Sequence, residues 1–275
     1  MCPSCGSLVG VRDEKCYSCG RANPGLWGFG PLLRQLGNDF GFVPIVIGGS
    51  AMLYLLTLLV SGGELQVGGG LSLLSPSLKA LFLFGASGSE PVFSYGRWWT
   101  VLSATWLHGG VLHILFNMLA FRQIAPTSSE MIGPARTVIV YTVAGAAGFL
   151  LSSFAGWMLP GVPILSGAPF TVGASASIFG LVGALVHYGR VSGSRLIRGH
   201  FTQYAILMFV MGLMFRGIDN YAHAGGFAGG YITSALLNPL TRERGDHMLG
   251  AIVCLAATLL AVLFSVVSGW RLINP

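Results

Sequence analysis

Three groups of polar residues lie in strongly apolar stretches of the sequence, and their types could together hydrolyse an amide bond. Ser175 lies in GASASIFG, where Gly or Ala fills three of its four nearest positions. His108, His113 and Asn117 share HGGVLHILFN, and His223 lies in AHAGGFAGG. Amide hydrolysis needs a nucleophile, a base and donors for the oxyanion. Ser175 could be the nucleophile and His223 the base, with Asn117, one of the other histidines and the Ser175 backbone N–H as donors.

Composition places these residues in a membrane. The chain is 53% hydrophobic and only 9% charged, whereas a soluble domain carries about 25% charged residues. The segment 62–99 is interrupted by Gly and Pro, which predicts a long loop in or near the membrane interface. Apolar runs of roughly 20 residues predict spanning helices, and seven such runs occur at about 41–61, 100–122, 137–158, 173–190, 201–217, 221–240 and 248–269.

The basic residues predict the orientation of these spans. Most of the 15 Lys and Arg residues fall on one side of the membrane when the N-terminus is cytoplasmic and the C-terminus outside, as the positive-inside rule requires. The second, fourth and sixth spans then run inward, with His108, Ser175 and His223 near their outer ends. His113 and Asn117 lie one to two turns deeper. Polar groups from three spans therefore share one layer in the outer leaflet.

Plainer interpretations exist for each of these residues. A serine in a span often bonds to a carbonyl of its own helix, and a membrane histidine can relay protons or bind a ligand. The convergence of three spans favours catalysis instead. Asp219 could orient His223 as a third member, but we favour a cap on the sixth span by Asp219 or Asn220. Interfacial positions without a catalytic role are predicted for His187, His200 and His247.

Four cysteines at the N-terminus have the spacing of a metal site. Cys2, Cys5, Cys16 and Cys19 form two CxxC pairs, each followed by Gly, which is typical of a zinc ribbon with four thiolate ligands. A redox-active pair or two disulfides are alternatives, although a cytoplasmic location disfavours disulfides. So small a unit would need the metal to fold. It could serve as a structural cap, dock a cytoplasmic partner or sense metal or redox state, and nucleic acid is disfavoured because basic residues are few. Cys254 is predicted to be a packing residue.

Together these motifs resemble the rhomboid family of intramembrane serine proteases over residues 41–240. The family's Gly-x-Ser-Gly motif appears as Gly173-Ala174-Ser175-Ala176, where Ala176 replaces the final glycine and would narrow the space beside the nucleophile. HGGVLHILFN carries the family's His-x4-His-x3-Asn pattern, and AHAGGFAGG carries Ala-His-x2-Gly-x3-Gly. The resemblance implies an all-α membrane fold, with a six-helix bundle, a seventh C-terminal transmembrane helix and a small N-terminal zinc ribbon.

The resemblance also implies roles for the site residues. Ser175 and His223 would act as a dyad through an acyl-enzyme, without a cofactor for catalysis. His113 and Asn117 would stabilise the oxyanion. The natural substrates would be single-span membrane proteins, cut near the outer leaflet of the lipid bilayer that surrounds the enzyme. The expected location is the bacterial cell membrane.

The same resemblance implies two supporting residues, and the sequence departs from the family pattern at one position. His108 would support the loops, and the ring of Phe179 would lie against the catalytic histidine. Many family members carry Trp-Arg in the first loop, with the Arg eight residues before the first histidine, but here Thr100 occupies that position. Arg97 could substitute from a shifted position, although Arg97 and the two tryptophans after it also suit an interfacial belt.

The predicted organisation has four parts and leaves two other functions open. The parts are a zinc-ribbon-like domain at 1–24, an interfacial linker at 25–40, the six-helix core at 41–240 and the added helix with its tail at 241–275. The first alternative is a catalytically silent rhomboid-like protein that binds or escorts membrane proteins, but such proteins usually lack the serine or the histidine. The second is a transporter with a histidine proton path, which would predict paired acidic residues or an inverted repeat. The spans contain neither.

Overall fold

The chain divides into two units, Met1–Gly41 and Phe42–Pro275. The computed structural model describes residues 2, 5–10, 12–24, 39–65, 73–162, 167–215 and 217–273. The first unit holds the four N-terminal cysteines, and the second holds all the long helices. Apart from residues 39 and 40, the linker predicted at 25–40 lies outside the described residues.

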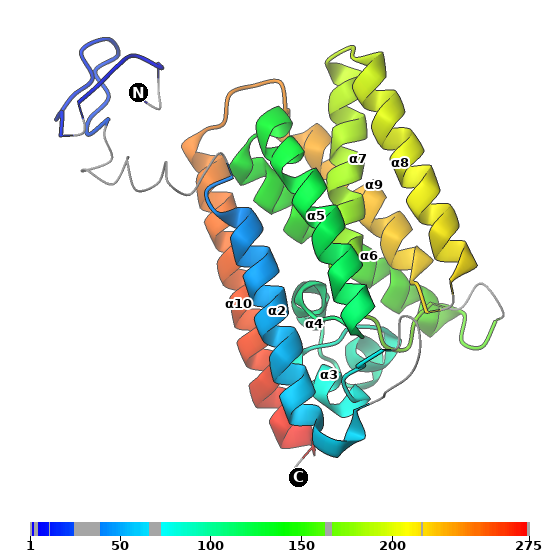
Figure 1. Ribbon diagram of the computed structural model, residues 1–275. Coiled ribbons are helices and arrows are strands. Elements are labelled where there is room, and N and C mark those ends of the chain that lie inside the picture. The colour runs from blue at the N-terminus through cyan, green and yellow to red at the C-terminus, as the bar shows by residue number, and fades with distance from the viewer. Residues whose placement is uncertain are drawn as a thin grey trace. The chain divides into compact units, whose positions relative to one another are not determined.

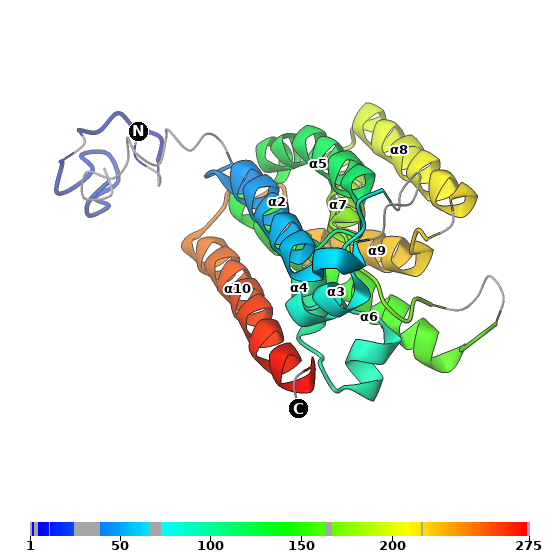
Figure 2. The same cartoon turned by 60° about the horizontal axis from the view of Figure 1, so that its bottom comes forward.

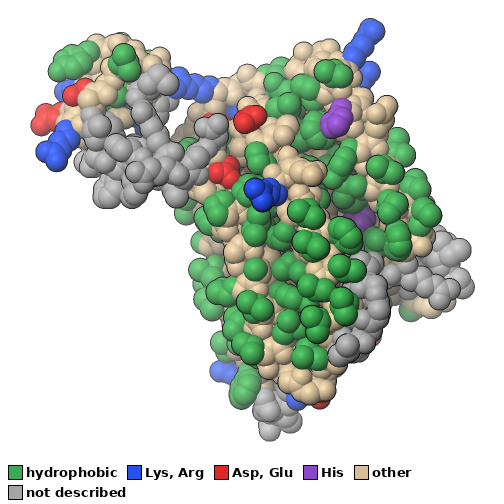
Figure 3. All heavy atoms as spheres, in the orientation of Figure 1, with side chains coloured by type: hydrophobic (Ala, Val, Ile, Leu, Met, Phe, Trp, Pro, Cys, Tyr) green, Lys and Arg blue, Asp and Glu red, His purple; other side chains and the backbone are tan. Residues whose placement is uncertain are grey.

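The second unit is a bundle of long helices (Figures 1 and 2). Four of them, namely α2 with its following turn, α6, α8 and α10, are long and apolar enough to cross a membrane, and α5 makes a fifth when joined to the short helical segment before it. Hydrophobic side chains cover much of the bundle face seen in Figure 3. The protein is therefore a multi-pass integral membrane protein. The long helices are α2 (Phe42–Ser61), α5 (Val111–Ile132), α6 (Pro134–Met158), α7 (Ser175–Val191), α8 (Arg195–Met214), α9 (Asn220–Leu237) and α10 (Gly245–Ile273).

α7 and α9 are the two shortest of the long helices; α7 lies at the centre of the bundle, and α9 packs along α7 and α6. With 17 and 18 residues, α7 and α9 are rich in glycine and carry serine and histidine. α7 packs against α5, α6, α8 and α9, and most of its residues are buried. A helix enclosed by other helices does not present an apolar surface to lipid, so it can carry polar side chains that a peripheral helix cannot.

The seven predicted spans correspond to α2 and α5–α10, but the predicted start of the second span is wrong. Residues 100–106 form the short helix α4 (Thr100–Ser103) and a 3₁₀ turn (Ala104–Trp106). The chain then bends by 92° before α5 begins at Val111. His108 lies in this bend, not in the span. The glycines at 109 and 110 follow it directly, and paired glycines favour such a break.

The segment predicted as a long loop at 62–99 contains helical structure. It includes α3 (Leu78–Phe84) and a π-helical turn (Glu90–Ser94). The hydroxyl of Ser77 caps the start of α3 by accepting the N–H of Ala80. The prediction that Arg97 belongs to an interfacial belt is wrong, because its side chain is only 1% exposed. Trp98, by contrast, is half exposed, as an interfacial residue would be.

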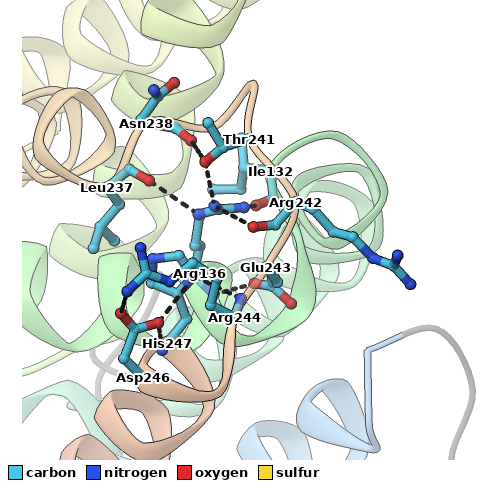
Figure 4. A network of polar contacts seen from close by, with 10 residues as sticks. All are labelled: Ile132, Arg136, Leu237, Asn238, Thr241, Arg242, Glu243, Arg244, Asp246 and His247. Atoms are coloured by element: carbon cyan, nitrogen blue, oxygen red, sulfur yellow. Dashed lines mark hydrogen bonds and ion pairs between the residues drawn. The ribbon is translucent and has the colours of Figure 1, made fainter. Parts of the chain in front are cut away.

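A buried arginine joins three helices at the end of the bundle where α10 begins (Figure 4). Arg136, in the first turn of α6, donates to the carbonyls of Ile132 at the end of α5 and Leu237 at the end of α9. It also donates to the hydroxyl of Thr241, and its backbone N–H donates to the Glu243 carboxylate at 2.8 Å. These bonds order the connection between α9 and α10, so α10 enters the bundle in a defined place.

Glycines bring α7 and α9 into backbone contact. A Cβ atom at Gly230 would overlap the carbonyl oxygen of Gly180, and one at Gly226 would overlap that of Ala176. Membrane helices associate through such close packing because lipid supplies no hydrophobic driving force between them. The spacing between α7 and α9 therefore depends on the absence of side chains at these positions.

We expect Gly230→Ala to destabilise the protein by about 1–3 kcal/mol, because the added methyl group forces two backbones apart. The matched control is Gly48→Ala in α2, where a Cβ would meet nothing within 4 Å. Both changes improve helix propensity equally, so the difference in stability between the two variants reports the contact of Gly230 with Gly180. Thermal unfolding in detergent measures both, and equal midpoints for the two variants would contradict the prediction.

Candidate active site

Ser175 is the first residue of α7 and follows a loop held by backbone hydrogen bonds. The N–H of Gly173 donates to the carbonyl of Ala104 at 3.0 Å, and Thr171 exchanges two backbone bonds with Ser87. Gly173 has φ +132°, which disfavours any residue with a side chain. Because Ser175 begins the helix, its backbone N–H has no partner within the helix. The loop thus presents both the hydroxyl and a free backbone donor.

His223 faces Ser175 from the first turn of α9. The distance from its Nε2 to the Ser175 Oγ is 2.8 Å. The ring of Phe179, one turn along α7 from Ser175, stacks on the imidazole with centroids 4.2 Å apart and planes at 19°. This stacking holds the imidazole in the plane that the hydrogen bond requires. For Nε2 to accept the serine proton, Nδ1 must carry the ring hydrogen.

His113 and Asn117 lie on one face of α5 beside this pair. The Nδ1 of His113 is 3.3 Å from the N–H of Gly109 and accepts from it, which leaves Nε2 as the N–H donor. A Cβ at Gly173 would be 2.7 Å from that Nε2 and 3.8 Å from the Ser175 Oγ. The imidazole of His113 therefore points toward the nucleophile, across the space that Gly173 leaves open.

Asn117 and His108 both contact His113. The side-chain N–H₂ of Asn117 donates one hydrogen to the carbonyl of His113 at 2.9 Å, so a second N–H remains for another acceptor. His108 is fully buried, and its ring meets that of His113 edge-on with centroids 5.2 Å apart. The structure thus brings His113 and Asn117 to the cavity and leaves His108 behind them as packing.

Ala176, which replaces the final glycine of the family motif, does not line the space beside Ser175. Its methyl group points toward α6, where a Cβ at Gly148 would come within 2.9 Å of it. Ala176 is fully buried with Phe149 and Ala222. The prediction that Ala176 narrows the space beside Ser175 is therefore wrong, because its methyl group packs against α6 at Gly148 and does not line the cavity.

A cavity of about 890 Å³ lies between the helices at Ser175 and His223. Ser175, His223, His113 and Asn117 are polar groups in a wall that is otherwise mainly apolar. The helix α8 contributes side chains such as Met208 to the opposite side. A cavity with few convergent polar groups in an apolar lining is the usual form of a binding site, and this one is large enough for several residues of an extended peptide.

Asp219 caps α9, as predicted, and does not contact His223 through its carboxylate. One carboxylate oxygen accepts the N–H of Ala222 at 2.9 Å, and the other accepts the hydroxyl of Ser152 at 2.5 Å. The Nδ1 of His223 has no hydrogen-bond partner among the described residues. Ser175 and His223 thus form a pair without a third member among the described residues. The contact with Ser152 was not predicted, because the only signal in the sequence is a polar residue within the third predicted span.

His187 forms a second histidine–serine pair at the opposite end of the same two helices. Its Nδ1 is 3.0 Å from the Oγ of Ser234, and both residues are buried. The prediction of an interfacial position for His187 is therefore wrong, because α9 covers it. Ser234 also contacts the carbonyl of Ala184, and neither member of the pair lines the cavity. We therefore interpret this pair as a structural contact between α7 and α9.

The four N-terminal cysteines lie close enough together to hold a metal ion. Their Sγ atoms are all within 4.8 Å of one another, with pairs at 3.7 Å (Cys2 and Cys19) and 3.6 Å (Cys5 and Cys16). Four ligands at about 2.3 Å around a tetrahedral zinc ion would be roughly 3.8 Å apart, whereas a disulfide requires about 2.05 Å. The sulfur positions therefore fit a metal site better than disulfides.

Both CxxC turns have the same local design. The glycine after each pair donates its N–H to the carbonyl of the first cysteine, at 2.9 Å for Gly6 and 2.8 Å for Gly20. Both glycines adopt left-handed φ angles of +77° and +72°, which glycine reaches without strain. Each turn thereby directs its two thiols to the same side.

The fold and the site together define a helical membrane protein in which Ser175 and His223 meet in a cavity between the helices. A family model described as the rhomboid domain matches residues 95–240, which is more than half of the chain. The chain therefore belongs to the rhomboid family.

Curated relatives carry the same family name. The chain is 29% identical to "Rhomboid protease GluP" of Bacillus subtilis (strain 168), over 70% of this chain and 36% of that protein. It is 31% identical to "RHOMBOID-like protein 4" of Arabidopsis thaliana, over 60% of this chain and 40% of the relative. It is 29% identical to "Rhomboid-like protease 5" of Toxoplasma gondii, over 58% of this chain and 18% of that protein. The aligned part of the chain thus spans less than half the length of each of these relatives.

Substitutions of Asp219 test whether its carboxylate caps α9 or instead orients His223 as a third member of the site. We expect Asp219→Asn to retain most of the stability and the position of His223, because Asn caps helices as well as Asp does. Asp219→Ala should lose about 1–2 kcal/mol, because the cap is removed and Ser152 loses its acceptor. Thermal unfolding measures this order, and equal loss in the two variants would argue that the charge matters rather than the cap.

Proposed function

We propose that the protein is an intramembrane serine endopeptidase that cleaves membrane proteins. The observation that carries the proposal is the 2.8 Å contact between the Ser175 Oγ and the His223 Nε2, in a cavity between membrane helices. A serine hydroxyl becomes a nucleophile when an adjacent base can take its proton. The protease names of the relatives from Bacillus subtilis and Toxoplasma gondii support the same activity.

In the proposed reaction His223 takes the proton of Ser175 as the oxygen attacks the scissile carbonyl. The C–N bond then breaks, His223 returns the proton to the leaving amine, and Ser175 holds the acyl group. A water molecule, deprotonated by His223, releases the second product and restores the hydroxyl. The developing oxyanion would be held by the Ser175 backbone N–H, the Nε2–H of His113 and the free N–H of Asn117. This scheme uses no cofactor.

The proposed substrates are the transmembrane segments of single-span proteins. The apolar lining of the cavity suits an apolar segment. Because the dyad reacts with an exposed backbone carbonyl, the segment must unwind, and small helix-breaking residues would help. With the N-terminus in the cytoplasm, as the basic residues favour, the first turns of α5, α7 and α9 lie toward the outer face. Cleavage would then occur near the outer leaflet, where water is closest.

The first test needs no knowledge of the substrate. We expect a fluorophosphonate probe to label Ser175 of the detergent-purified protein, with a bond from Oγ to phosphorus and loss of fluoride. Ser175→Ala should abolish labelling, and His223→Ala should slow it by roughly 10²–10⁴-fold, the usual contribution of a general base. Mass spectrometry locates the adduct.

Ser234 is an internal control for this test, because it also contacts a histidine but does not line the cavity. Adducts at both serines would indicate nonspecific reaction. A folded protein that remains unlabelled would contradict the protease and would favour a catalytically silent protein that binds membrane segments.

We also propose that the four N-terminal cysteines bind one structural zinc ion as thiolates. The supporting observations are the sulfur separations and the matched glycine turns of the two pairs. Such a site would supply folding energy to a unit that is too small to form a large apolar core. The dyad lies in the other unit and would not use this metal.

Metal analysis of the full-length protein checks this proposal. We expect about one zinc ion per chain, released by a strong chelator. Cys16→Ser should lose the metal, because Cys16 is buried among the other sulfur atoms. Cys254→Ser is the matched control, since Cys254 lies in α10 and should retain full occupancy. Equal zinc content in both variants would overturn the assignment.

A further inference from the structure

Arg97 is a buried cation without an acidic partner. Neither of the two ion pairs found among the described residues involves it. Its guanidinium donates to the carbonyl of Phe82 in α3 at 2.6 Å and to that of Ser265 in α10 at 2.7 Å. It also lies 4.3 Å from the centroid of the Phe82 ring. Carbonyl dipoles and an aromatic face therefore compensate a charge that would otherwise be costly to bury.

The side chain of Ser265 continues this contact. Its hydroxyl accepts the indole N–H of Trp99 at 3.1 Å and lies 3.4 Å from the hydroxyl of Ser103 in α4. Ser103 in turn donates to the carbonyl of Gly85 at 2.8 Å. Gly85 has φ +103°, and a Cβ there would overlap both serine hydroxyls. We call Arg97, Trp99, Ser103 and Ser265 the Arg97 clamp, and it joins α10 to α3 and α4.

The clamp lies next to the loop that carries the nucleophile. Ser103 precedes Ala104, whose carbonyl accepts the N–H of Gly173. Gly173 is two residues before Ser175, and its lack of a side chain leaves the space between Ser175 and His113. A continuous set of contacts therefore leads from α10 through α4 to the nucleophile. None of the described residues that line the cavity belongs to α10, so any effect of α10 on the site is indirect. α10 also packs against α6, which packs against α7 and α9, but the contacts through Ser103 and Ala104 are the ones that lead to the loop before Ser175.

We propose that α10 is a positioning element of the active site, because the Arg97 clamp fixes α4 against α10 and α4 fixes Gly173 and Ser175. The inference rests on the proposed function and extends it to a helix outside the six-helix core. Arg97 is a positioning residue, since it touches neither Ser175 nor His223. The conservative change to Lys would not replace it, because one ammonium group lacks the planar fork that reaches two carbonyls.

The first experiment compares Arg97→Met with Arg244→Met in the full-length protein. Met has a similar length but no N–H donors, and Arg244 is the matched control because its side chain is 75% exposed. We expect Arg97→Met to slow fluorophosphonate labelling of Ser175 by roughly tenfold to a hundredfold, as small misplacements of a reacting group do. Amide hydrogen exchange in residues 171–175 should become faster. Arg244→Met should change neither.

A reversible tether separates positioning from general loss of structure. In the Arg97→Met background, Ser103→Cys and Ser265→Cys together would place two thiols where two hydroxyls lie 3.4 Å apart. Oxidation to a disulfide, verified by mass spectrometry, should restore labelling, and reduction of the same sample should slow it again. The two single-cysteine variants control for effects of the oxidant on other cysteines.

The outcomes distinguish this inference from the proposed function. If Arg97→Met leaves both labelling and exchange at residues 171–175 unchanged, the positioning role of α10 is wrong and the protease stands. If labelling slows but the disulfide does not restore it, Arg97 supports only its own loop and the inference is overturned. If the parent protein is never labelled but exchange still responds to Arg97→Met, the contact path stands and the protease fails.

Discussion

The close approach of α7 and α9 is the constraint on which the site depends. Side chains as short as serine and histidine can meet only when their backbones are near, and the 2.8 Å contact of the dyad lies next to the point where Gly226 faces the carbonyl of Ala176. Further along the two helices Gly230 faces Gly180 in the same way. The glycines of AHAGGFAGG therefore determine the geometry of the dyad, although none of them takes part in the chemistry.

Polar groups inside the bundle follow one rule, which is that each charged group is held by several fixed partners. The Asp219 carboxylate accepts from Ser152 and from the first turn of α9. Arg136 and Arg97 are held by main-chain carbonyls at the two ends of α10. Burial of a charge is costly unless hydrogen bonds compensate it, so these residues specify where the helices meet, although the Nε of Arg97 has no partner among the described residues. His223 is different, because its Nε2 contacts Ser175 and its Nδ1 has no partner among the described residues; in the proposed reaction Nε2 exchanges a proton with Ser175.

The sequence predicted the parts of the site that depend on helix direction and register. Ser175 and His223 could be placed in one layer because spans alternate in direction and each residue rises by about 1.5 Å. The role of Arg97 could not be predicted, because its partner Ser265 is 168 residues away. The buried position of His187 likewise depends on Ser234 of another helix. The bend at His108 was missed because hydropathy does not distinguish a continuous span from two helical pieces at 92°.

The walls of the cavity differ in how deeply their helices are buried. α7 and α9 are fixed against α6 by backbone contacts, and few side chains could move there without overlap. Among the described residues of α8, only Phe201 and Gly212 are buried. Near its end by the dyad, α8 is joined to α9 by the bond from the Asn220 side chain to the Gly212 carbonyl, at 3.1 Å. α8 packs mainly against α7 and has few contacts with α9, so the bond between Asn220 and Gly212 is one of the few links across the side of the cavity between α8 and α9.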